Sequence, residues 1–303
     1  MKYSLHIFLL LFALLPSASN GQDKSTYYTV MHPDEFTTDW TGWYEKWDAW
    51  TAELRAEFPH HLDLAYGKDP KQKLDLYLAK GTLKDAPVFL FFHGGGFREG
   101  DRAHYGYVAR PFIENGIIAA IASYRLIPKN TYPDQRNDTR DAVAWLYKNI
   151  GSYGGDPRSL FVGGHSAGGL MTGHVCANTD WLTERSIPKD ALQGCAPMSV
   201  DHGFESIRKR TTYLPDASDH KEATPILNIK NPPSYFVVSA GGDEARLIEP
   251  TKEFAAKLRE AGSTAVVVFG KGMDHAEIVA ALGDGDSKLF KAVLEMIQSE
   301  PGT

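Results

Sequence analysis

The sequence predicts an α/β fold in which a mostly parallel, eight-stranded sheet is flanked by helices. From about residue 62 onward, short apolar runs alternate with longer stretches suited to helices, and the connections are short and rich in Gly, Pro and Asp. This alternation is typical of a parallel sheet wrapped by helices. The chain has 303 residues, of which 43% are hydrophobic, so one domain of this kind can bury a substantial core.

Each apolar run predicts one strand, because a strand covered on both faces is a nearly continuous hydrophobic stretch. The run at residues 88–92, for example, is Val-Phe-Leu-Phe-Phe. The expected strands lie near 62–67, 73–78, 87–92, 117–124, 159–165, 192–199, 234–240 and 263–269. Helices are expected near 106–115, 136–149, 167–178, 250–262 and 287–299. The polar stretch 200–233 is expected to be a loop at the carboxyl side of the strands.

The first 21 residues have the features of a secretory signal peptide. Lys2 gives a positive charge, residues 7–15 are nine consecutive apolar residues, and residues 16–21 include small residues for cleavage. Nine apolar residues are far fewer than the ~20 needed to span a bilayer. We therefore expect a secreted or periplasmic protein, with a membrane anchor or a buried N-terminal helix as the alternative.

A G-x-S-x-G motif at residues 164–168 follows an apolar run and precedes a helical stretch. Such a strand–turn–helix unit places a serine on a strained turn, where only small flanking residues fit. The start of the helix also supplies backbone N–H groups that favour developing negative charge. The motif predicts a nucleophilic serine, Ser166, and the alternative is a glycine-rich turn without chemistry.

A second motif, His-Gly-Gly-Gly at residues 93–96, comes directly after the apolar run at 88–92. Consecutive glycines allow backbone N–H groups to face an approaching oxygen without obstruction. This loop accompanies the serine turn in lipases and esterases, where it stabilises an oxyanion. We expect the oxyanion hole to be formed by the N–H groups of Gly95, Gly96 and Ala167. A flexible glycine turn is the alternative.

The general base is expected to be His275, because it is the single histidine after residue 220. In this arrangement the acid lies between the serine and the histidine in the sequence. The turn at 241–244, Gly-Gly-Asp-Glu, follows a predicted strand and supplies two carboxylates. Asp243 is the predicted acid, because its shorter side chain comes directly after the two glycines. Glu244 is the alternative.

With these motifs in order, the chain resembles the α/β-hydrolases of the esterase branch, which includes hormone-sensitive-lipase-like and bacterial carboxylesterases and the arylformamidases. The resemblance covers roughly residues 70–298. Further stretches that carry it are Tyr124-Arg125-Leu126 with Pro128, Tyr132-Pro133, Tyr153 to Pro157, Thr224-Pro225 and Pro232-Pro233. Two departures leave the substrate open. His165 stands where many hormone-sensitive-lipase-like members have Asp, and residues 199–202 differ from the arylformamidase pattern.

The resemblance also gives a role to a tryptophan-rich segment near the N-terminus. Trp40, Trp43, Trp47 and Trp50 repeat at spacings of three and four, which predicts one apolar face of a helix within residues 39–58. Such a face packs on a core or, as in the related esterases, helps to cap the active site. We accordingly expect a signal peptide at 1–21, an N-terminal helical cap segment at 22–61 and a catalytic domain at 62–303.

Together these features predict a secreted serine carboxylesterase that acts on small to medium acyl esters through a Ser-Asp-His triad and an acyl-enzyme. The alternatives are an arylformamidase-type amide hydrolase and a non-catalytic binding module of the same fold. No metal or organic cofactor is expected, and the expected partner is a small-molecule ester. A net charge of −6 argues against nucleic acid and against an anionic membrane surface. Cys176 and Cys195 occupy core-type positions, and the sequence leaves open whether they form a disulfide.

Overall fold

The computed structural model describes residues 38–299, so the expected signal peptide at 1–21 and the first part of the 22–61 segment lie outside the described residues. The sheet has eight strands in the order β1-β2-β4-β3-β5-β6-β7-β8. Strand β2 is antiparallel to β1 and β4, and all other neighbours are parallel. The strands are β1 His60–Ala65, β2 Lys73–Tyr77, β3 Ala86–Phe92, β4 Ile118–Ala122, β5 Gly155–His165, β6 Leu192–Met198, β7 Tyr235–Gly241 and β8 Thr264–Gly270.

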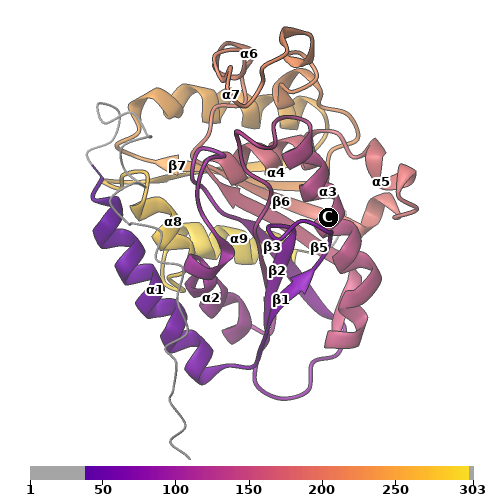
Figure 1. Cartoon of the computed structure of the whole chain (residues 1–303), viewed down its shortest axis with the longest axis vertical. Coiled ribbons are helices and arrows are strands. Elements are labelled where there is room, and N and C mark those ends of the chain that lie inside the picture. Colours follow the sequence, from indigo (N-terminus) through magenta and orange to yellow (C-terminus); the bar gives the residue numbers. More distant parts are fainter. Residues whose placement is uncertain (1–37, 300–303) are drawn as a thin grey trace, which may run out of the picture.

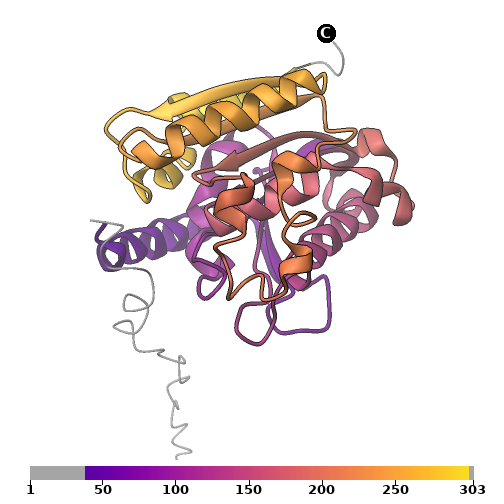
Figure 2. The same cartoon turned by 90° about the horizontal axis from the view of Figure 1, so that it is seen from above.

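Helices cover both faces of this sheet. Their bounds are α1 Trp40–Glu57, α2 Ala109–Glu114, α3 Asp134–Asn149, α4 Ala167–Ala177, α5 Asp180–Glu184, α6 Phe204–Ile207, α7 Ala245–Glu260, α8 Glu277–Leu282 and α9 Lys288–Gln298. Helices α3, α4 and α7 contribute to the core on one face, and α1, α2, α8 and α9 contribute to the core on the other. Figures 1 and 2 show α1 along one side of the molecule, next to α2.

Strand β3 illustrates why the central strands are apolar throughout. Val88, Leu90 and Phe92 belong to one core, whereas Phe89 and Phe91 belong to the core on the opposite face. Successive side chains of a strand point to opposite faces, so a strand covered by helices on both sides needs apolar residues at every position. The eight strands predicted from such runs are confirmed.

One helix boundary and two short helices differ from the prediction near the site. Helix α7 begins at Ala245, five residues before the predicted start, and contains Pro250 in its second turn. A proline normally favours a helix start, and here the helix continues through it. The short helices α6 and α8 were not predicted, and both lie in segments at the carboxyl edge of the sheet.

A disulfide joins Cys176 at the end of α4 to Cys195 in β6. The sequence left this pairing open, because two cysteines 19 residues apart on different elements reveal nothing of their distance. The bond ties the helix that follows Ser166 to the neighbouring strand. Within residues 38–299, no helix combines the length and the apolar character needed to cross a bilayer.

Candidate active site

Ser166 lies where β5 ends and α4 begins. Its backbone has φ 54° and ψ −113°, a conformation that a serine rarely adopts and that stores local strain. The backbone N–H of Ser166 donates to Met198 O at 2.8 Å, which fixes the turn against β6. The flanking glycines are required sterically, because a Cβ at Gly164 or Gly168 would lie 2.4 Å or 2.1 Å from a backbone oxygen. The turn therefore has the geometry that the sequence motif predicts.

His275 lies in the loop after β8, and its partner is a carboxylate at the end of β7. The distance from His275 Nδ1 to Glu244 Oε1 is 2.5 Å. The other oxygen, Glu244 Oε2, accepts hydrogen bonds from Ser199 Oγ at 2.6 Å and from Gly241 N at 2.8 Å. Both members of the pair are buried, with 3% of His275 and 8% of Glu244 exposed.

Ser166 and His275 line the same cavity, which has a volume of about 360 Å³. Its walls come from the loop after β3, the segment that follows β6 and the first turn of α7. A second space of about 10 Å³ lies beside the same two residues and is also lined by Gly95. The serine predicted to be the nucleophile and the histidine predicted to be the base therefore meet at one opening.

The glycines of the 93–96 loop have the backbone that an oxyanion loop needs. Gly95 and Gly96 have φ values of +118° and +58°, which side chains disfavour. A Cβ at Gly95 would lie 2.2 Å from Glu99 O, so the loop closes on itself too tightly for any other residue. Gly96 lines the larger cavity with Ser166, and Ala167 begins α4, where N–H groups have no partner within the helix. Their role as oxyanion donors stays a prediction.

Comparisons with known proteins find hydrolases that are similar to this chain. A family model named BD-FAE matches residues 74–186. A protein of Oryza sativa subsp. japonica named "probable isoprenylcysteine alpha-carbonyl methylesterase" is 27% identical over 262 residues, which cover 78% of this chain and 63% of that protein. Kynurenine formamidase of Danio rerio is 25% identical over 250 residues, which cover 78% of this chain and 81% of that protein. The solved structure of a thermostable esterase from Pseudomonas putida has a TM-score of 0.64 and 23% identity, covering 84% of this chain and 89% of that one.

The chain has the α/β-hydrolase fold and is similar to enzymes of its esterase branch. It thus spans less than two thirds of the length of the rice methylesterase and most of the length of the formamidase.

The carboxylate that pairs with His275 differs from the sequence prediction by one residue. Asp243 is exposed, and its backbone N–H donates to Met273 O at 3.2 Å. The following residue, Glu244, lies directly before α7, and its side chain turns back to the N–H of Gly241. Because the helix starts at Ala245, the glutamate and not the aspartate faces the end of β7. The longer side chain is what reaches His275.

Electrostatics at Glu244 favour the ionised carboxylate. Burial raises the pKa of Glu244, but the hydrogen bond and charge of His275 and the hydrogen bonds from Ser199 and Gly241 outweigh burial and lower the pKa to about 2. An ionised carboxylate only accepts hydrogen bonds, so His275 Nδ1 carries the proton in this contact. Nε2 is then the ring nitrogen that can take up a proton.

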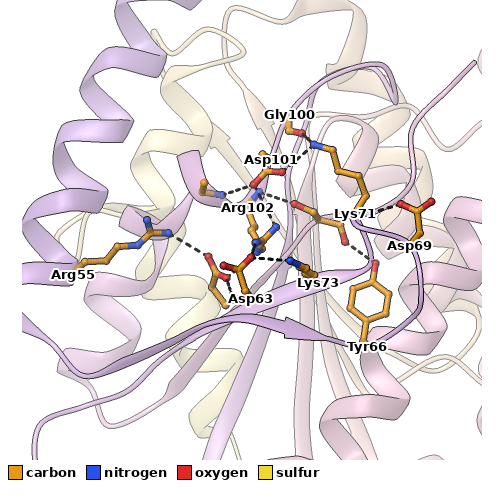
Figure 3. A network of polar contacts seen from close by, with 12 residues as sticks. Arg55, Asp63, Tyr66, Asp69, Lys71, Lys73, Gly100, Asp101 and Arg102 are labelled. Atoms are coloured by element: carbon orange, nitrogen blue, oxygen red, sulfur yellow. Dashed lines mark hydrogen bonds and ion pairs between the residues drawn. The ribbon is translucent and has the colours of Figure 1, made fainter. Parts of the chain in front are cut away.

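A charged network anchors the end of the glycine loop (Figure 3). Arg102, just beyond the loop, donates from Nε to Asp75 Oδ1 at 2.8 Å, and Arg55 of α1 reaches Asp75 Oδ2 at 3.2 Å. Lys71 Nζ binds Asp101 Oδ2 at 2.9 Å. Asp75 is 2% exposed, so the ion pair with Arg102 is shielded from solvent. The network joins the loop to β2 and α1.

The tryptophans of α1 lie in two environments: Trp47 packs in the core, and Trp40 lies beside the site. Trp47 is fully buried, in the core that α1 shares with α2. Trp40, at the first turn, packs edge-on against the His275 ring with 5.9 Å between ring centroids, and it lines the smaller space beside Ser166. The helix therefore reaches the site at its N-terminal end, and its influence on substrate choice stays a prediction.

His165, which the sequence marked only as a departure from relatives, lies against the predicted base. The ring centroids of His165 and His275 are 4.4 Å apart. Burial first, and then the nearby His275, lower the pKa of His165 well below its ordinary value, so its ring stays neutral. Among residues 38–299, no group of His, Cys, Asp and Glu side chains is arranged to hold a metal ion.

Proposed function

We propose that this hydrolase is a serine carboxylesterase that cleaves small to medium acyl esters, with Ser166, His275 and Glu244 as its catalytic triad. The observation that carries the proposal is that a strained serine and a buried His–Glu pair line one cavity. A cavity of about 360 Å³ is at the small end of ligand sites, which supports esters of modest size.

In the first half of the proposed reaction, Ser166 Oγ attacks the ester carbonyl carbon while His275 Nε2 takes the hydroxyl proton. The carbonyl oxygen becomes an oxyanion and accepts hydrogen bonds from the N–H groups of Gly95, Gly96 and Ala167. His275 then gives the proton to the leaving alcohol oxygen as the bond between carbonyl carbon and alcohol breaks.

In the second half, water takes the place of the alcohol. His275 Nε2 accepts a proton from the water, whose oxygen attacks the acyl-enzyme carbon. The proton returns to Ser166 Oγ as the acid product leaves. Glu244 keeps the proton on Nδ1 throughout and stabilises the imidazolium that forms in each half.

An amide substrate is the second candidate, and it is favoured by the similarity to a kynurenine formamidase. The same triad would act on an N-formyl group. Parallel assays with a short aryl ester and N-formylkynurenine separate the two candidates. The substrate that is hydrolysed with the higher kcat/KM identifies the activity as esterase or amidase.

We also propose that the protein is secreted or periplasmic. The signal-like residues 1–21 support this, as does the disulfide between Cys176 and Cys195, because disulfides persist in oxidising compartments. Expression of the full chain in a bacterial host tests the proposal. The mature protein should appear outside the cytoplasm and should begin near residue 20 or 22 by mass spectrometry. A cytoplasmic protein that retains Met1 would contradict it.

Ser166→Ala is the direct test of the reaction. Ester turnover should fall by on the order of 10⁶, because a triad without its nucleophile retains almost nothing of its rate. Covalent labelling by an organophosphate should disappear, while the melting temperature confirms a folded protein. Ser218→Ala is a matched control, because this exposed serine lies outside the cavity. A Ser166→Ala protein with appreciable turnover in clean preparations would reject the serine mechanism.

A further inference from the structure

The cavity beside Ser166 has a cationic wall. Four of its lining residues carry a positive charge, and one, Asp201, carries a negative charge. The cationic residues are Arg98, Lys209, Arg210 and Arg246. The whole chain has a net charge of −6, so positive charge is concentrated at the opening against the overall balance.

Two acids of the segment after β6, Asp201 and Glu205, have partners other than Arg98 and Lys209. Asp201 is half-buried, and its Oδ1 accepts a hydrogen bond from the backbone N–H of Gly203 at 2.7 Å. Glu205, the next acid along the chain, pairs with Arg208, which does not line the cavity.

Two of the cations are left for a ligand. Arg98 and Lys209 are exposed, and neither takes part in an ion pair within residues 38–299. Their charges therefore face the solvent-filled opening.

The cationic residues come from separate parts of the chain. Arg98 follows the oxyanion glycines, Lys209 belongs to the segment after β6, and Arg246 lies in the first turn of α7. The rings of Phe97 and Tyr213 stack with 3.8 Å between centroids, and both residues line the cavity. This stack joins the glycine loop next to Arg98 to the segment that carries Lys209.

We propose that the natural ester carries a carboxylate on the part that occupies this cavity. The inference rests on the proposed esterase function and names its substrate class. A cleft lined by charge of one sign concentrates ligands of the opposite sign and raises their association rate. Guanidinium groups also bind carboxylates through paired, charge-assisted hydrogen bonds. A neutral ester of the same shape gains neither contribution.

The test compares esters that differ in charge and little in shape. On the alcohol side the pair is para-acetoxybenzoate and para-acetoxybenzamide. On the acyl side it is monomethyl terephthalate and methyl para-carbamoylbenzoate. In at least one pair, kcat/KM for the anionic ester should exceed that for the neutral ester by about tenfold at low ionic strength. The ratio should fall as salt is added, because salt screens exposed charges.

Charge-neutralising variants locate the effect. Arg98→Gln and Lys209→Gln should each lower the anionic-to-neutral ratio several-fold. Lys252→Gln makes the same charge change on α7 at a residue outside the cavity wall, and it should leave the ratio unchanged.

The possible results separate the inference from the function on which it rests. A ratio near one in both pairs, with Ser166-dependent hydrolysis intact, overturns the charge inference and leaves the esterase proposal standing. A ratio that Arg98→Gln and Lys209→Gln do not change also overturns it. If Ser166→Ala makes no difference to either ester of either pair, the esterase proposal fails and the inference fails with it.

Discussion

Replacing Glu244 by Gln changes one atom of the buried pair and should nearly abolish turnover. Two donors, Gly241 N–H and Ser199 Oγ–H, face Glu244 Oε2. The backbone N–H of Gly241 cannot become an acceptor, so the glutamine oxygen must take this side. Its NH₂ group then points at His275 Nδ1, which becomes an acceptor. The ring is left with its proton on Nε2 and cannot accept one from Ser166.

The size of the effect follows from this reversed tautomer. Exchanging the acid of a Ser-His-Asp triad for its amide lowers kcat by about 10⁴. That factor corresponds to about 5 kcal/mol of transition-state stabilisation. Asp243→Asn is the matched control on the adjacent residue, because its side chain is exposed. A surface change of this kind should alter kcat by no more than about twofold.

The assay measures kcat and KM of both variants on one short aryl ester, with melting curves to confirm folding. KM should stay near the wild-type value in both, since neither change alters the cavity wall. A larger loss in Asp243→Asn than in Glu244→Gln would refute the assignment of the acid. So would a Glu244→Gln enzyme that keeps a tenth or more of the wild-type kcat.

Three other substitutions test separate parts of the structure. Trp47→Ala should cost about 3–5 kcal/mol of unfolding free energy in denaturant titrations, whereas Trp40→Ala should mainly raise KM or shift acyl-chain preference; unchanged chain-length profiles would remove the cap role. Burial raises the pKa of Glu99 to about 7, so the folded chain holds a proton that the unfolded chain loses above about pH 4.5, and stability falls as the pH rises through that window. At pH 8, Glu99→Gln should therefore be more stable than wild type by about 1 kcal/mol and melt at a higher temperature; the gain is small because the side chain keeps contact with water. At pH 4 the two proteins should melt at the same temperature, and a lower melting temperature of the variant at pH 8 would contradict this. Asp75→Asn should cost about 2–3 kcal/mol, since it removes the buried carboxylate that Arg102 and Arg55 share while Arg102 keeps Asp63 and Asp101, and a stability within 1 kcal/mol of wild type would show that this carboxylate is dispensable.

The sequence was sufficient wherever a feature depends on neighbouring residues. The strands follow from continuous apolar runs, and the turn at Ser166 follows from glycines that the backbone requires. The tight turn at Gly95 and Gly96 could be predicted for the same reason, because their positive φ angles demand glycine at those positions. His275 was found by its order in the chain.

The sequence was insufficient where a side chain's role depends on the orientation of a whole element. The choice between Asp243 and Glu244 is decided by the first residue of α7, and Pro250 suggested a later start. Nothing in the sequence marks Ser199 as a partner of the acid. The cationic wall could not be predicted either, because its residues meet only after β3, β5, β6 and β7 are placed side by side.

Within the segment that follows β6, residues 198 and 199 support the reacting groups, whereas later residues contribute to the cavity wall. Met198 O holds the turn of Ser166, and Ser199 bonds both Glu244 and Ser239 O. Ser199 also lines the cavity, and Val200, Asp201 and residues 209–213 continue its wall. Mutations within residues 200–213 can thus diversify the range of esters accepted, during natural evolution or in a laboratory library, while Ser166, Glu244 and His275 stay in register. This arrangement makes residues 200–213 the place to graft a new specificity onto this hydrolase.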